Sequence, residues 1–168
     1  MTNKISNGMN KYIVGIIGIL AIIFLVFAVD AQNNKKQEEN KQVASVITVE
    51  KTMYNFGDID IFDGKVSATY TLKNEGDEDV KIISAVTSCA CTEGEIGNMR
   101  FGMHSATGEQ VIIPAGGEEI LTATFDPLAH GPNGTGKATR QLMLKTNSTE
   151  TPEIEVRFEA NVIKNKNE

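Results

Sequence analysis

The chain has 168 residues, a net charge of −6 at pH 7 and only two cysteines. This length accommodates one ordinary domain with an appendage, and two cysteines cannot form the disulfide framework that stabilises small secreted domains. The acidic side chains are concentrated after residue 41 and no basic stripe accompanies them, so the composition argues against a nucleic-acid-binding protein.

The N-terminal region contains an uncharged apolar segment, residues 12–29, between Lys11 and Asp30. A bilayer core needs ~20 apolar residues, with a lower limit of about 17, so this segment is long enough to span a membrane. Lys4 and Lys11 precede it and predict that residues 1–11 stay in the cytoplasm. We therefore expect a single-pass membrane protein whose C-terminal domain is extracytoplasmic.

A cleaved signal peptide is the alternative interpretation of the same segment. Val29 and Ala31 are small residues at the two recognition positions of a possible cleavage site. The apolar run exceeds the roughly 7–15 residues of a signal-peptide core, which favours an uncleaved anchor. Cleavage near Ala31 would instead give a secreted or periplasmic protein. Both interpretations place the body of the protein outside the cytoplasm.

Residues 30–45 are predominantly polar and are predicted to form a linker. The domain that follows is expected to span residues 46–163, and residues 164–168 form a polar tail. Apolar and polar residues alternate most clearly at residues 66–72 and 153–162, which indicates strands with one buried face. Further strands are expected at residues 47–52, 80–87, 111–113, 120–125 and 141–146.

Turn-forming sequences separate these predicted strands, at residues 74–77, 114–117, 126–127 and 131–136. Residues 58–64 are read as a turn rather than a calcium loop, because the acidic spacing differs from that of an EF-hand. Six or seven short strands, with no amphipathic helix between them, predict an all-β fold. The expected architecture is an Ig-like antiparallel β-sandwich, without the disulfide and tryptophan of immunoglobulin domains.

The body also carries an ordered series of short motifs that resembles a known family. The motifs are Tyr54-Asn55-Phe56-Gly57-Asp58-Ile59, Tyr70-Thr71-Leu72-Lys73-Asn74-Glu75-Gly76, Ser88-Cys89-Ala90-Cys91-Thr92, Ile113-Pro114-Ala115-Gly116, Ala123-Thr124-Phe125-Asp126-Pro127 and Met143-Leu144-Lys145-Thr146-Asn147. Over about residues 46–163 this series resembles the bacterial domain-of-unknown-function family fifteen seventy-three, whose members look like the Ig-like domains of the abnormal-spindle and hydin group.

The resemblance implies an extracytoplasmic Ig-like domain with no established activity. Residues 93–110 depart from the family pattern, since they form a longer connection than expected between the cysteine motif and the Pro-x-Gly turn. Long loops inside compact domains often carry function. We therefore expect contacts with a protein partner at residues 93–110.

Cys89 and Cys91 are the candidate thiol pair. On a strand, residues two apart lie ~7 Å from each other, too far for a disulfide, so a direct bond would require a tight turn. Packing as two small buried residues is the favoured interpretation, because free cysteine is often buried. A reversible thiol pair is the second interpretation, and a metal site with His104 and His130 is the third. The C-x-C spacing differs from that of structural zinc sites, so no metal or other cofactor is expected.

The sequence contains no nucleophile motif to accompany His130 as a base, so we expect a protein without enzymatic activity, and the sequence identifies no small-molecule substrate. The predicted function is that of a membrane-anchored, extracytoplasmic protein-binding or structural module, whose partners are other envelope or surface proteins. The alternative is an envelope thiol-redox or metal-binding protein that uses Cys89 and Cys91.

Overall fold

The computed structural model describes residues 17, 20, 22–30, 32, 41–104 and 106–165. The chain forms two compact units, Met1–Lys41 and Gln42–Glu168. In the first unit, residues 22–30 are helical. Among the residues that the structure describes, no helix has the length and apolar character needed to cross a membrane. Residues 12–16, 18, 19 and 21 of the predicted segment 12–29 lie outside the described residues.

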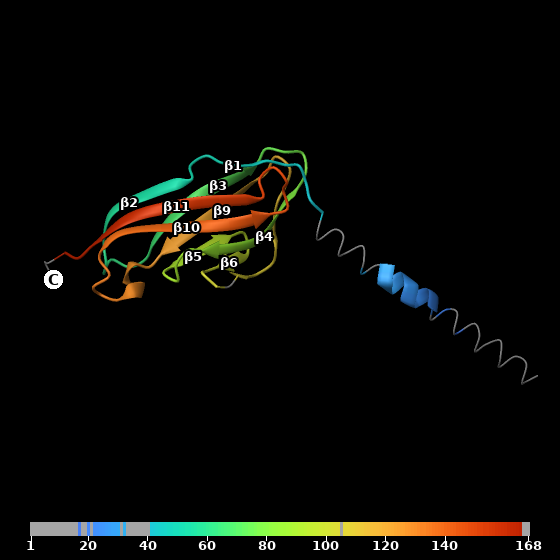
Figure 1. Ribbon diagram of the computed structural model, residues 1–168, viewed down its shortest axis with the longest axis horizontal. Helices are drawn as coiled ribbons and strands as arrows, with labels where there is room; N and C mark the ends of the chain where they lie inside the picture. The colour runs from blue at the N-terminus through green and yellow to red at the C-terminus, as the bar shows by residue number, and fades with distance from the viewer. Residues whose placement is uncertain are drawn as a thin grey trace, which may run out of the picture. The chain divides into compact units, whose positions relative to one another are not determined.

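The second unit is an all-β sandwich of two sheets (Figure 1). The six-stranded sheet has the strand order β1-β3-β9-β5-β6-β7, and the five-stranded sheet has the order β2-β11-β10-β4-β8. The strands are β1 (Ile47–Val49), β2 (Met53–Asp60), β3 (Val66–Asn74), β4 (Val80–Thr87), β5 (Thr92–Ile96), β6 (Met99–Phe101), β7 (Ala106–Thr107), β8 (Val111–Ile113), β9 (Glu118–Phe125), β10 (Gly136–Thr146) and β11 (Glu153–Ile163).

The core lies between the sheets and is formed by alternate residues of the long strands. In β11 every second side chain from Ile154 to Val162 is buried, which confirms the predicted alternation. Phe125 of β9 and Phe158 of β11 come from opposite sheets, and their ring centroids lie 5.4 Å apart. A shift of one residue in the register of β11 would expose its whole apolar set, so this pattern fixes the register.

The β3–β4 connection is held by a buried asparagine. The Asn74 side chain donates to the carbonyl oxygens of Glu78 and Ile113, over 2.8 and 3.0 Å, and accepts from the backbone N–H of Gly76. Asn74 belongs to β3 of the six-stranded sheet, whereas Ile113 belongs to β8 of the five-stranded sheet. One side chain thus joins both sheets to the turn between them.

Strand β2 is parallel to β11, which corrects the prediction of a fully antiparallel sandwich. Figure 1 shows β2, near the start of the body, beside the last strand of the chain. The sequence prediction did not include β2. Its side chains are at most partly buried, and Gly57, at φ +69°, interrupts the alternation of inward and outward side chains along the strand. The pairing register shifts opposite this position, between Glu159 and Asn161.

Residues 93–110 do not form one long connection as predicted. They include most of β5 and all of β6 and β7, which extend the six-stranded sheet. Gly94 lies opposite Phe101 in the β5–β6 pair, and both are buried. A Cβ atom on Gly94 would lie 2.2 Å from Phe101 Cζ, so the ring occupies the space that a larger residue would need.

The sandwich begins earlier than the predicted boundary at residue 46. Val43 and Ser45 are buried, although they lie in the segment expected to be a polar linker. The backbone N–H of Val43 donates to the carbonyl oxygen of Asn147 over 3.0 Å, and the Ser148 hydroxyl donates to the carbonyl oxygen of Ser45. These contacts attach the start of the body to the turn between β10 and β11.

Candidate functional site: the cysteine turn

The two cysteines lie in the turn that leads from β4 to β5, and therefore from one sheet to the other. We call residues 88–91 the cysteine turn. Their Cα atoms are 5.2 Å apart and their sulfurs form a disulfide. This corrects the favoured interpretation of two separately packed residues. That interpretation assumed an extended strand, whereas the chain turns at residues 88–91 and brings the side chains together. The tight turn that a bond would require is present.

Hydrogen bonds within and around the turn fix its conformation. The buried Thr87 hydroxyl lies 3.0 Å from the carbonyl oxygen of Cys89 and 3.1 Å from that of Thr92. Ser88 and Gln141 of β10 exchange two bonds of 2.9 Å, in which Ser88 N–H donates to the Gln141 carbonyl and Gln141 N–H donates to the Ser88 hydroxyl. The turn is thus attached to the five-stranded sheet at β10.

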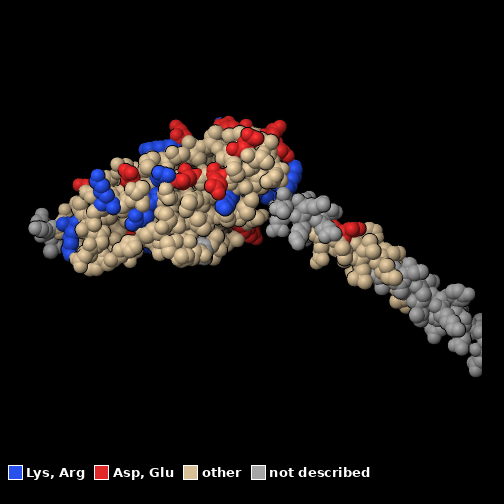
Figure 2. Space-filling model, in the orientation of Figure 1, with Lys and Arg blue, Asp and Glu red and all other residues tan. Residues whose placement is uncertain are grey.

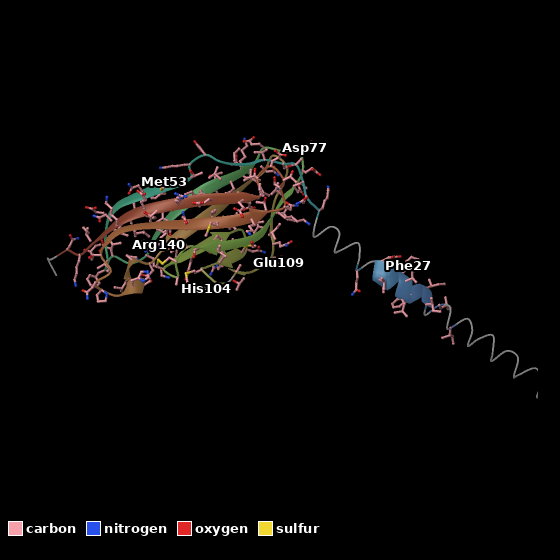
Figure 3. The ribbon with its side chains drawn as sticks, viewed as in Figure 1. Phe27, Met53, Asp77, His104, Glu109 and Arg140 are labelled. Atoms are coloured by element: carbon pink, nitrogen blue, oxygen red, sulfur yellow. A yellow bond between two sulfur atoms is a disulfide. The ribbon has the colours of Figure 1, made fainter. Side chains whose placement is uncertain are left out.

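Each sulfur has a nitrogen-bearing side chain beside it. Arg140 of β10 donates from Nε to Cys91 Sγ over 3.0 Å, and its guanidinium also lies over the Phe125 ring, 5.7 Å from the centroid. His130 Nε2 lies 3.4 Å from Cys89 Sγ. Figure 3 labels Arg140 near yellow sulfur atoms toward the η1 end of the body. Cys91 is buried and Cys89 is half-buried, so Cys89 is the more accessible sulfur.

His130 reaches the cysteines through the short 3₁₀ helix η1 (Pro127–His130), which follows β9. Asp126 caps this helix, since its carboxylate accepts from the backbone N–H of Leu128 over 2.9 Å. The N–H of Asp126 in turn donates to the carbonyl oxygen of Cys91 over 2.9 Å. The Asp-Pro turn predicted from the sequence therefore positions the imidazole against the cysteine turn.

Of the predicted site residues, the structure brings together Cys89, Cys91 and His130, whose ligand atoms all lie within 4.8 Å of one another. His104 does not belong to this group, so three of the four residues of the alternative metal-site interpretation lie together. Arg140 was not predicted, because no local motif marks an arginine 49 residues beyond the cysteine that it contacts.

Residues 93–110, where partner contacts were expected, line a surface cavity of about 410 Å³. Its polar wall includes Glu93, Glu95, Arg100 and Thr107, and Arg100 Nε lies 3.1 Å from a carboxylate oxygen of Glu95. Both of these side chains are largely exposed, so the ion pair adds little stability. Figure 2 shows acidic and basic side chains interspersed on the visible face of the body.

A second surface feature lies on the outer face of the five-stranded sheet. Exposed apolar side chains gather on β4, β8 and β10, and we call this set the outer apolar patch: Ile83, Val86, Ile112 and Met143. Val86 and Met143 are direct cross-strand partners. Ile112 lies on β8, which is the end strand of this sheet.

Comparison with known proteins identifies the family. The family model described as "Protein of unknown function (DUF1573)" matches residues 47–162, most of the chain. The chain belongs to this family. The match agrees with the resemblance found from the ordered motifs. A comparison with curated protein sequences finds no match.

Two solved structures with TM-scores above 0.5 support the sandwich fold. A protein of unknown function from Porphyromonas gingivalis W83 has a TM-score of 0.56 at 17% identity, and the match covers 73% of this chain and 49% of that one. A family 123 glycoside hydrolase from Clostridium perfringens has a TM-score of 0.53 at 5% identity, covering 73% of this chain and 28% of that one. The ASH/PapD-like domain 7 of human CEP192 has a TM-score of 0.48 at 15% identity, covering 75% and 91%.

Proposed function

We propose that this DUF1573 chain is an extracytoplasmic module that binds a protein partner through the outer apolar patch and the adjoining edge of β8. The observation that carries the proposal is the patch itself, in which Ile83 and Ile112 are 49% and 47% exposed on the same sheet. Clusters of exposed apolar side chains on one face are typical of interaction sites, whereas single exposed residues need no explanation.

The position of the patch indicates the kind of partner. Strand β8 is the end strand of its sheet, and among the described residues its only strand partner is β4. Its outer edge can therefore accept an extended segment by strand addition. Because side chains alternate along a strand, the added segment would place apolar residues beside Ile112. The proposed partner is a protein with an exposed strand of alternating apolar and polar residues.

The proposed location follows from residues 12–29. As a membrane anchor they hold the body outside the membrane, where other envelope or surface proteins are accessible. Cleavage near Ala31 would release the same body into the periplasm or the medium. Immunoblotting of fractionated cells distinguishes the two, because the anchored chain stays in the membrane pellet at full length, whereas the cleaved chain is shorter and soluble.

The binding proposal is tested with charge substitutions in the patch. Full-length chains carrying Ile83→Lys or Ile112→Lys are expressed in the native cell, crosslinked, and the recovered proteins are quantified by mass spectrometry. We expect recovery of the partner to fall at least about tenfold, which corresponds to a loss of roughly 1.4 kcal/mol of binding free energy. Thermal melting of each variant establishes that the sandwich is intact.

Ile120→Lys is the matched control. Ile120 is 48% exposed on β9, in the six-stranded sheet, so the same change is made at equal exposure on the opposite face. We expect this variant to recover the partner like the unaltered chain. Recovery that is unchanged in both patch variants, or that falls equally in Ile120→Lys, would contradict the proposed surface.

The cysteine turn favours thiol–disulfide exchange as a second candidate function. A partner thiolate would attack Cys89 Sγ, the more accessible sulfur, to form a mixed disulfide and release Cys91 as a thiolate next to the Arg140 guanidinium. A second thiolate of the partner can then attack the mixed disulfide, which oxidises the partner and releases Cys89 as a thiolate. Alternatively, the Cys91 thiolate attacks Cys89 Sγ, which re-forms the internal disulfide and releases the partner. Positive charge beside the departing sulfur favours this direction of attack.

Trapping tests this second function. A Cys91→Ser chain, whose Cys89 cannot re-form the internal disulfide, should accumulate disulfide-linked partners that disappear after reduction. The Cys89→Ser chain is the matched control and should trap fewer partners, because the sulfur of Cys91 is buried. Equal trapping by both chains, or by neither, would count against exchange at Cys89.

A further inference from the structure

The cysteine turn brings together a set of metal-ligating atoms that the binding proposal does not use. The atoms are Cys89 Sγ, Cys91 Sγ and one ring nitrogen of His130, all within 4.8 Å of one another. We propose that reduction of the disulfide converts this turn into a three-coordinate site for Cu(I). The inference shares with the exchange function only the requirement that the disulfide can be reduced.

The chemical step begins with the disulfide. A dithiol reductant gives two electrons and two protons to the Cys89–Cys91 bond, which becomes two thiols, while the reductant becomes a disulfide. One Cu(I) ion then binds, the two thiols release their protons to solvent, and both sulfurs coordinate as thiolates. Copper stays Cu(I) throughout, so the site requires no further oxidant or reductant.

The separation of the ligand atoms fits one shared ion. With metal bonds of about 2.3 Å to sulfur and about 2.0 Å to nitrogen, and angles of about 120° around a three-coordinate ion, two sulfur ligands lie about 4.0 Å apart and a sulfur and a nitrogen ligand about 3.7 Å apart. His130 Nε2 already lies 3.4 Å from Cys89 Sγ, held by η1 and its Asp126 cap. Breaking the disulfide frees the two sulfurs to move apart to the spacing of two ligands of one ion, so the site needs only a local adjustment of the turn.

The charge of the surroundings favours a monovalent ion. Two thiolates and one Cu(I) carry a net charge of −1, which the Arg140 guanidinium beside Cys91 neutralises. A complex of the same ligands with Zn(II) would have no net charge, so it would leave the guanidinium without a counter-charge. Structural zinc also takes four ligands, whereas the described residues offer three. Soft thiolate ligands match Cu(I).

The test uses the purified full-length chain under anaerobic conditions. It is fully reduced, which is verified by thiol titration, freed of reductant and titrated with Cu(I) against a coloured Cu(I) chelator. We expect one copper per chain and an X-ray absorption spectrum of two sulfur ligands and one nitrogen ligand. The oxidised chain, in which both sulfurs are blocked, should not compete with the chelator.

Variants locate the site. Cys89→Ser and Cys91→Ser should each abolish competition with the chelator, and His130→Ala should weaken Cu(I) binding by at least about tenfold. His104→Ala is the matched control and should bind as the unaltered chain does, since His104 is outside the ligand group. Arg140→Gln should lower the ratio of Cu(I) affinity to Zn(II) affinity.

Three outcomes would overturn the inference. A fully reduced chain that binds no copper contradicts the site, whatever its exchange activity. Copper binding that is unchanged in His130→Ala contradicts the imidazole ligand. Binding of Zn(II) at one ion per chain without binding of Cu(I) contradicts the choice of metal. Because reduction is verified before metal is added, absence of copper binding is distinguishable from absence of thiol exchange.

Discussion

The hydroxyl of Tyr70, on β3, donates a 2.7 Å hydrogen bond to the backbone carbonyl oxygen of Arg157, on β11. The two residues belong to different sheets, so this bond crosses the core. The Tyr70 side chain is buried, and the bond provides its polar end with a partner inside the sandwich. Removing the hydroxyl would leave the Arg157 carbonyl without this donor.

Tyr70→Phe should therefore destabilise the sandwich. We expect the free energy of unfolding to fall by about 1–2 kcal/mol, the usual cost of losing a buried hydrogen bond. Chemical denaturation of both chains measures the difference. Tyr54→Phe is the matched control, because Tyr54 is partly exposed and the described structure gives its hydroxyl no hydrogen bond. A loss of equal size in the control would contradict this account.

Stability should also fall at high pH because of Tyr70. Burial, with a smaller contribution from the charge of Tyr54, raises the pKa of Tyr70 from 10.0 to about 12. Between these values the unfolded chain loses this proton while the folded chain keeps it. The contribution to stability is therefore complete below pH 10 and is lost as the pH rises toward 12. Denaturation at stepped pH should show a shallower alkaline decline for Tyr70→Phe, and parallel curves would contradict the assignment.

The two cysteines should differ in reactivity after reduction. Cys91 is 3% exposed, whereas Cys89 is half-buried and lies nearer to solvent. We expect an alkylating reagent to modify Cys89 first, as measured by mass spectrometry of peptides at successive times. Labelling in denaturant supplies the control, because both thiols should then react at similar rates. Faster labelling of Cys91 in the folded chain would show that the turn rearranges when the bond is broken.

The buried Asn74 should be more important for stability than an exposed asparagine. Asn74→Ala removes two donated bonds and one accepted bond at the β3–β4 connection. We expect a loss of about 2–3 kcal/mol, because buried polar groups lose their partners. Asn161→Ala is the control, since it removes an exposed 2.8 Å bond to Asp58. Similar losses in the two variants, measured by denaturation, would refute the proposed role of Asn74.

Gly94 should not tolerate a side chain while Phe101 is present. Gly94→Ala would place a methyl group within 2.2 Å of the Phe101 ring, and we expect a loss of about 1–3 kcal/mol from overpacking. Gly102→Ala should be nearly neutral, because no atom lies within 4 Å of its added Cβ. In a Phe101→Leu background the cost of Gly94→Ala should shrink, and an unchanged cost in this double-mutant cycle would contradict the contact.

The sandwich could be predicted from the sequence where alternation was strict. Strand β11 extends the predicted segment by one residue, because it buries alternate apolar side chains. Strand β4, which is rich in β-branched residues, begins and ends where predicted, although its alternation breaks at Ile83 and Ser84. Strands β5 to β7 were missed, since glycine and methionine occupy inward positions that β-branched residues usually fill. The aromatic ring of Phe101 supplies the packing that Gly94 lacks, and only the strand pairing reveals this relationship.

The candidate site could be predicted only in part. Its cysteines were evident from their spacing, and His130 was named as a possible ligand. Whether the sulfurs meet depends on the backbone of the β4–β5 turn, which the single intervening alanine does not determine. Arg140 contacts Cys91 because β10 lies next to β4 in the sheet, and that adjacency is a property of the whole fold.

The parallel pairing of β2 with β11 affects the order in which the protein can fold. Met53, in the second strand of the body, pairs with Arg157, in its last strand. Strand β11 is also an internal strand of its sheet, with β2 on one side and β10 on the other. A chain that leaves the ribosome or a translocation channel N-terminus first holds β2 without its neighbour until the last strand emerges. The five-stranded sheet can therefore be completed only once β11 has emerged, and such long-range pairing makes folding slow.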